Sequence, residues 1–276
     1  MLRVHQITTQ YNIGICIERD IVNDCKYKQA ISNIQSLSKK YQLKVYTQEA
    51  IPNTDYIIHS DPSQKMIDDY IKLEIDCFIR GINDTFTFQS KLKNTFGYKD
   101  ILRLSFFKDA KDRKFGIGPV SAGEGEGKTK RLEFAMKVCD FFIYAGINPK
   151  IAVMSRCRSG SILYSYQNRK SWEESDFIVS KLIENGISAR NVGIEIENAV
   201  AEFNYILVVN GITGNQIYRM LTFFTNSEIL GVPAFFKKDL KFNCLYEDNS
   251  RNDTNYENHI QAAIFFAEKR KMLSKL

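Results

Sequence analysis

The residues best suited to chemistry stand in short glycine- and serine-rich stretches that follow apolar runs. The sharpest of these, Ala122–Thr129, reads Ala-Gly-Glu-Gly-Glu-Gly-Lys-Thr. Its spacing fits a relaxed phosphate-binding loop, in which backbone N–H groups cradle phosphates, Lys128 reaches them and Thr129 holds Mg²⁺. The first glycine of that motif is absent, and Glu124 and Glu126 would place negative charge beside the phosphates. A loop for another ligand and a flexible connection into a helix are the alternatives.

A second candidate is Asn210–Asn215, which separates an apolar run from a helical pattern and reads Asn-Gly-Ile-Thr-Gly-Asn. Glycine allows a backbone to approach a ligand closely, and a helix start offers free N–H groups to an anion. Arg219, one turn into that helix, would add positive charge. A tight turn without a ligand is the alternative interpretation.

A third candidate, Ser155–Ser161, follows an apolar run and contains two arginines and three serines. Such groups at the end of a strand suit a phosphate or a carboxylate, whereas a solvated loop is the alternative. Cys157, between Arg156 and Arg158, could have a lowered pKa, but no histidine stands near it in the sequence to act as its base. The six cysteines form no Cys-x-x-Cys pair and the three histidines are scattered, so we expect no metal site.

The most polar part of the chain, residues 243–258, is long enough to form a functional loop. It contains Asp-Asn-Ser-Arg at Asp248–Arg251, and Glu257 follows at the start of a helical pattern. Taken alone, this stretch indicates only a polar loop.

Apolar runs that alternate with helical patterns must position these loops. The pattern predicts βαβ units and a mostly parallel sheet, in which ligands lie outside the carboxyl ends of the strands. Strands are expected at residues 13–17, 43–47, 55–59, 75–79, 101–107, 115–120, 150–155, 205–209 and 232–236, with an extended segment at 191–196. Helices are expected at residues 27–41, 64–73, 86–94, 128–145, 172–185, 215–224 and 256–272.

The composition excludes several classes of protein. The 276 residues carry 38 basic and 32 acidic side chains, a net charge of +6, and 44% are hydrophobic, which is enough for a core and excludes disorder as the main state. The basic residues form no stripe with interleaved aromatics, so we expect no nucleic-acid partner. No apolar run approaches ~18 residues and no leader is evident, so we expect a cytoplasmic protein without a membrane partner.

Six blocks in this order resemble one family: IDCFIRG, FGIGPVSAGEG, MSRCRSG, GIEIENAV, VVNGITGNQIYRMLTFF and DNSR before the last helix. From about Ile75 to the end, and more weakly before it, the chain resembles the methanogenesis marker 4 or MtxX proteins of methanogenic archaea, which are labelled methyltransferase subunit X. The Gly-x-x-Gly-Asn block and its following arginine are the most specific part. The resemblance implies a transferase with methyltransferase subunits as partners. The chain itself shows no S-adenosylmethionine loop and no corrinoid-binding histidine motif.

A wider resemblance is to the phosphate acetyl- and butyryltransferases and to the acyl-phosphate synthesis protein PlsX, which share the isopropylmalate-dehydrogenase-like fold. It implies an α/β protein of two domains with an interdomain cleft. The first domain would comprise residues 1–107 and 228–276, and the second, inserted domain residues 108–227. Relatives with this fold are commonly dimers, which implies a homodimer here.

The same resemblance assigns site residues. The expected catalytic residues are Ser250, Arg251 and Glu257. The expected ligand-binding residues are Gly81, Glu124, Ser155, Arg158, Asn210, Gly214, Asn215 and Arg219. The chain also departs from the phosphotransacetylases, because Asn210 stands where they have an aspartate and Asn252 where a glycine follows Ser-Arg. An asparagine cannot act as a base.

Three functions follow as hypotheses. The first is an MtxX-like transferase that binds a small anionic ligand of phosphate or acyl type in the cleft. The second is a non-catalytic accessory subunit of a methyltransferase complex, which the loss of the acid at Asn210 favours. The third is a nucleotide binder that uses Lys128. The sequence predicts no particular cofactor.

Overall fold

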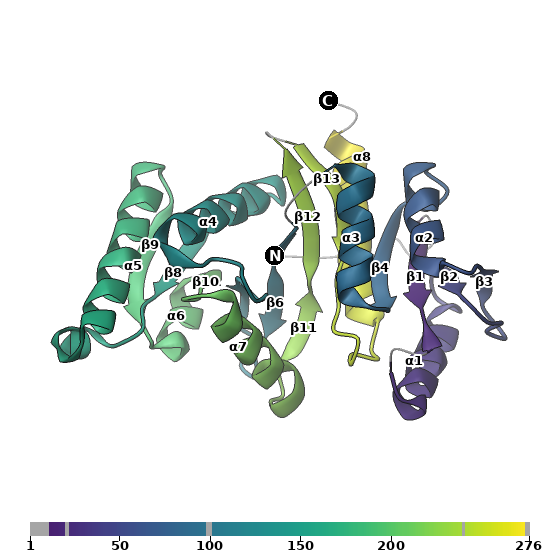
Figure 1. Cartoon of the computed structure of the whole chain (residues 1–276), viewed down its shortest axis with the longest axis horizontal. Helices are drawn as coiled ribbons and strands as arrows, with labels where there is room; N and C mark the ends of the chain where they lie inside the picture. The colour runs from purple at the N-terminus through teal and green to yellow at the C-terminus, as the bar shows by residue number, and fades with distance from the viewer. Residues whose placement is uncertain (1–10, 20–21, 98–100, 239–240, 274–276) are drawn as a thin grey trace. The chain divides into compact units, whose positions relative to one another are not determined.

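The computed structural model of the chain describes residues 11–19, 22–97, 101–238 and 241–273 (Figure 1). Contacts between Cα atoms divide it into two compact units. One unit is continuous and comprises Leu102–Leu230, and the other combines the segment up to Ile101 with Gly231–Leu276. Each unit is built around its own β-sheet with helices against it, so the mixed α/β class expected from the sequence is confirmed.

The discontinuous unit contains the strands β3-β2-β1-β4-β13-β12, side by side in this order in one sheet. Strands β1 to β4 pair in parallel, β13 joins β4 in parallel, and β12 pairs with β13 antiparallel. The strands are β1 (Asn12–Ile17), β2 (Gln42–Thr47), β3 (Asp55–Ile58), β4 (Cys77–Ile82), β12 (Pro233–Lys238) and β13 (Lys241–Glu247). The helices are α1 (Asp24–Leu37), α2 (Pro62–Ile71), α3 (Thr85–Phe96) and α8 (Glu257–Leu273).

The central strands of this sheet are buried on both faces, as the continuous apolar runs of parallel strands require. Because side chains alternate along a strand, Ile13, Ile15 and Ile17 of β1 enter the apolar cluster that includes residues of α1 and α8. Cys16 of β1 enters a second cluster, which includes residues of α2 and α3 and the ring of Phe78. The two clusters explain why helices are needed on both sides.

The continuous unit contains a six-stranded sheet in the order β11-β6-β7-β10-β8-β9. Strands β7, β10, β8 and β9 are parallel, and β6 pairs with β7 antiparallel. The strands of this sheet are β6 (Ser105–Lys108), β7 (Lys114–Gly118), β8 (Lys150–Met154), β9 (Ser188–Gly193), β10 (Tyr205–Leu207) and β11 (Glu228–Gly231), and the short strand β5 (Leu102–Arg103) also belongs to this unit. The helical elements are α4 (Gly127–Tyr144), the 3₁₀ turn η2 (Ser159–Tyr164), α5 (Tyr166–Glu184), α6 (Ile196–Glu202) and α7 (Gly211–Phe224).

Several sequence-based boundaries are wrong; helix α5, for example, begins at Tyr166 rather than at residue 172. Helix α7 begins at Gly211 rather than at Asn215, because the Asn210 side chain accepts a hydrogen bond from the Thr213 N–H (2.9 Å) and caps a helix that starts with two glycines in its first turn. Residues 243–247 belong to strand β13 and not to a loop, because β13 lies between two other strands, which overrides its polar sequence. The segment expected to be extended to residue 196 turns into α6 instead.

Candidate functional site

Strands β4 and β13 end side by side, and a buried arginine joins the segments beyond their ends. Arg80 of β4, 3% exposed, donates through Nε to the carboxylate of Asp248 and through Nη2 to the backbone carbonyl of Asn249. Its Nη1 donates to the carbonyl and the side-chain oxygen of Asn83, both at 3.3 Å. One guanidinium therefore holds the start of the loop after β13. The carboxylate that it binds is buried as well, since Asp248 is only 4% exposed.

Gly81 contributes backbone rather than a side chain. Its N–H donates to the Asn249 side-chain oxygen at 2.8 Å, and its φ of +72° lies in the region that favours glycine. A Cβ atom at this position would overlap the carbonyl oxygen of Cys16 in β1. Gly81 thus lets β4 pass close to β1 while its amide anchors the same loop that Arg80 holds.

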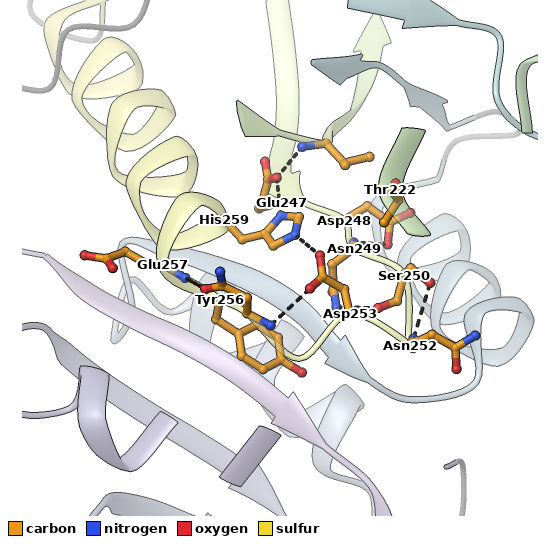
Figure 2. Close-up of polar contacts among 12 residues, drawn as sticks. Thr222, Glu247, Asp248, Asn249, Ser250, Asn252, Asp253, Tyr256, Glu257 and His259 are labelled. Carbon is orange, nitrogen blue, oxygen red and sulfur yellow. Dashed lines mark hydrogen bonds and ion pairs between the residues drawn. The ribbon is translucent and has the colours of Figure 1, made fainter. Parts of the chain in front are cut away.

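Ser250 and Arg251 stand on this anchored loop. Ser250 is half-buried, and its hydroxyl oxygen accepts a hydrogen bond from the Asn252 N–H at 3.3 Å (Figure 2). Arg251 is exposed. The pKa of Asp84, the N-cap of α3, is lowered first by the hydrogen bonds from Thr87 and further by the charges of Arg251 and Arg80. The hydroxyl, the exposed guanidinium and a helix start therefore lie in one region.

The third expected catalytic residue, Glu257, lies apart from these groups. It begins α8, and its carboxylate accepts from Lys40 Nζ at 2.5 Å and from the Tyr41 hydroxyl at 3.5 Å. Figure 2 shows its side chain turned away from Ser250. The acid that faces the loop is Asp253, which sequence reasoning missed.

Asp253 belongs to a buried chain of three ionisable groups. Nδ1 of His259 lies 2.8 Å from Glu247 Oε1, and Nε2 lies 3.0 Å from Asp253 Oδ2 (Figure 2). His259 and Glu247 are fully buried, and the Val232 N–H donates to the same oxygen of Glu247. No spacing in the sequence signals this chain, because its members belong to β13, a loop and α8.

Contacts within the Glu247–His259–Asp253 group shift the pKa values of its members. Burial disfavours the His259 cation, but hydrogen bonds and charge from Asp253 and Glu247 outweigh it and raise the pKa of His259 to about 10. Burial raises the pKa of Glu247 to about 7, against the opposing effect of His259. His259 is therefore a buried cation at neutral pH.

We expect the free energy of unfolding to fall as the pH rises from 7 to 8.5. The unfolded histidine loses its proton near pH 6.5, whereas native His259 keeps it to about pH 10, so the native state binds more protons in this interval. One such group gives a slope of at most about 1.4 kcal/mol per pH unit. Buried Glu247, whose pKa is also raised, adds to this slope and would keep a raised pKa if His259 were removed. Urea titrations across this range should therefore show the slope in the natural protein and lose it in the double variant Glu247→Gln, His259→Asn; an unchanged slope in the double variant would exclude the two groups as its source.

In the continuous unit, the Gly-x-x-Gly-Asn block packs a helix against a loop. Cβ atoms at Gly211 and Gly214 would overlap the carbonyl oxygens of Ser121 and Pro119. The Asn215 side-chain N–H donates to the Val120 carbonyl at 3.0 Å. Asn210 also caps this helix. Packing or hydrogen bonds among the described residues therefore account for both glycines and both asparagines of this block.

The glycine-rich stretch before α4 is tied to the same helix start. Glu124 is half-buried and lies 3.4 Å from Arg103, and its backbone carbonyl accepts from the Gly211 N–H at 3.1 Å. Burial raises the pKa of Glu124, although Arg103 opposes this. The Lys128 ammonium lies 4.9 Å from the centre of the Phe177 ring, on α5. The lysine that would reach phosphates is thus held against an aromatic side chain.

The loop after β8 divides into a buried and an exposed part. The buried Ser155 hydroxyl donates to the Asn191 side-chain oxygen at 2.7 Å and so ties β8 to β9. Cys157 is 5% exposed, which does not suit a nucleophile. Arg158 is exposed and pairs with Glu195 at 3.5 Å. It lines a hollow of about 740 Å³ whose other charged residues are Arg113, Arg190, Glu195, Glu197 and Glu202.

The last of the expected ligand-binding residues, Arg219, is exposed, and its guanidinium lies 5.3 Å from the centre of the Phe223 ring. Within the described residues, no group of three or more histidine, cysteine, aspartate or glutamate side chains could hold a metal ion. Over the same ranges, no helix combines the length and the apolar character needed to cross a bilayer.

No protein-family model matches the chain. Among curated proteins, it is 29% identical over 215 residues to the "Putative methyltransferase mtx subunit X" of Methanosarcina mazei, covering 78% of this chain and 74% of the relative. It is 27% identical over 237 residues to the protein of the same name from Methanosarcina barkeri, covering 86% of this chain and 82% of the relative. The resemblance predicted from the sequence blocks is confirmed.

Solved structures with a similar fold include phosphotransacylases. A branched-chain phosphotransacylase from Enterococcus faecalis matches 95% of this chain and 100% of its own, with a TM-score of 0.63 and 13% identity. A phosphotransacetylase from Streptococcus pyogenes matches 94% of each chain, with a TM-score of 0.60 and 12% identity. The expectation of a phosphotransacetylase-like fold is therefore confirmed.

Proposed function

We propose that this protein is a transferase-like methyltransferase subunit that binds a small anionic ligand of phosphate or acyl-phosphate type at the loop following β13. Ser250 would donate a hydrogen bond to the ligand and Arg251 would supply the positive charge. The proposal is supported by the relatives named methyltransferase subunit X and by the fold shared with phosphotransacylases, whose names imply phosphate and acyl groups.

The observation that carries the proposal is the contrast between the base of the loop and its tip. Asp248 and Asn249 are buried and held by Arg80 and Gly81, whereas Arg251 is exposed. A rigid base costs little further ordering when a ligand binds, and an exposed guanidinium can form paired hydrogen bonds to phosphate. Arg158 and Arg219, exposed in the other unit, stay predictions as ligand-binding residues.

The test is a calorimetric titration of the protein with acetyl phosphate and, separately, with inorganic phosphate. We expect Arg251→Ala to weaken binding of the probe about tenfold or more, because a charge-assisted hydrogen bond contributes about 1.5–3 kcal/mol. Ser250→Ala should weaken it by a smaller factor. Arg169→Ala, which removes an exposed arginine of α5, is the matched control and should bind as the natural protein does.

An equal loss in the control variant, or no loss in Arg251→Ala, would contradict the proposed site. If the natural protein binds neither probe, the second function is favoured, namely that of an accessory subunit without catalysis. Asn210 supports this alternative, since its amide caps α7 and supplies no base.

A further inference from the structure

We propose that His259 is the positioning residue of the segment Asp248–Asn252, acting as a buried cation that joins the two ends of this loop. Its importance for ligand binding rests on the proposed function, because the loop carries Ser250 and Arg251. Its effect on the conformation of the loop does not.

The hydrogen bonds around the His259 ring are satisfied together when each of its nitrogens carries a proton. Both nitrogens face carboxylate oxygens, Glu247 Oε1 at 2.8 Å and Asp253 Oδ2 at 3.0 Å. The same oxygen of Glu247 accepts a further hydrogen bond from the Val232 N–H. A neutral imidazole has one N–H, and only the protonated ring donates from both nitrogens.

The two acids stand at opposite ends of the loop. Glu247 is the last residue of β13, directly before the loop, and Asp253 lies just beyond its tip, where its N–H donates to the Ser250 carbonyl at 2.8 Å. His259 reaches both from the first turn of α8. The loop is thus closed at its two ends by one side chain, as Figure 2 shows.

Negative charge surrounds the ring. Asp248 adds negative charge near Glu247, and Asp253 adds it near the buried hydroxyl of Tyr256 at the start of α8. Arg80, on β4, is the other buried cation acting in this region of the described structure. Without the His259 cation, Glu247 would be an uncompensated buried acid, and Asp253 would lose the contact that draws it inward.

The test compares His259→Asn with the natural protein by amide hydrogen exchange. Asparagine can still donate one hydrogen bond to Glu247 but is too short to bridge both acids. We expect exchange at residues 248–255 to accelerate about tenfold or more while the β1 and β4 amides stay protected. His59→Asn is the matched control, because His59 is exposed and its ring contacts the backbone of Asp61 in its own loop. Its exchange should equal that of the natural protein.

Two further measurements keep the proposal open to refutation. Nitrogen NMR of the His259 ring should show both nitrogens protonated from pH 6 to 8.5, and a neutral ring in this range would overturn the proposal. If His259→Asn does not fold, Asp253→Ala removes one end of the bridge at a 14% exposed side chain and should also loosen the loop. Unchanged exchange in Asp253→Ala would contradict the proposal.

Failure of this proposal and failure of the proposed function are distinguishable. If the natural protein binds neither acetyl phosphate nor phosphate but His259→Asn loosens the loop, the positioning role holds and the ligand proposal fails. If the natural protein binds acetyl phosphate and His259→Asn binds it equally with a protected loop, His259 does not position it.

Discussion

Arg80→Met is expected to lower the free energy of unfolding by about 3–5 kcal/mol, the usual result of removing one partner of a buried ion pair. The substitution keeps the apolar volume but withdraws the guanidinium from Asp248 and from the backbone carbonyl of Asn249. Both acceptors are buried, so water cannot replace the lost donors unless the segments that follow β4 and β13 separate. Urea unfolding followed by far-ultraviolet circular dichroism measures the change.

The double variant Arg80→Met, Asp248→Asn should recover part of this loss, about 2 kcal/mol, because no unbalanced buried charge remains. Arg19→Met is the surface control. Arg19 pairs with Glu49 at 3.3 Å with both side chains largely exposed, and water and salt screen such pairs, so the control should lose little stability. Equal losses in Arg80→Met and Arg19→Met would show that burial of the Arg80 pair has no energetic consequence.

Gly214→Ala is expected to destabilise the protein by about 3 kcal/mol, although alanine is ordinarily favoured over glycine inside a helix by about 1 kcal/mol. The added methyl group would overlap the Pro119 carbonyl oxygen and approach the Val208 side chain to 2.9 Å. The first obstacle is backbone, which cannot rotate away as a side chain can. Relief requires α7 to move off the loop at residues 119–124, and thermal unfolding would report the loss.

Gly160→Ala is the matched control for this prediction. A Cβ atom at Gly160 would meet nothing within 4 Å, and its φ is not in the left-handed region. The control should unfold at the temperature of the natural protein. A Gly214→Ala variant as stable as the control would mean that α7 tolerates displacement from the loop, and the close packing would then not explain the glycine.

Most of the strands and helices could be located from the sequence because the burial of one or both faces of an element imposes a regular spacing of its apolar residues. The run Ile13–Ile17 is apolar throughout since β1 is covered on both faces, and the spacing in α4 repeats every three to four residues since one face is buried. Patterns failed where a local preference was overridden. Two glycines at the start of α7 indicated a turn, but they are there because two carbonyl groups lie against the helix.

The α/β class, most of the strands and helices, the relatives and the loop that carries Ser250 and Arg251 can be inferred from the order of the residues alone. The contacts that hold this loop cannot, because they depend on the folded chain. Arg80 and Asp248 are 168 positions apart, and the Glu247–His259–Asp253 chain joins a strand, a loop and a helix. Periodicity records whether a residue is buried but not which residue faces it, so buried charges find their partners only once the sheet has brought distant segments together.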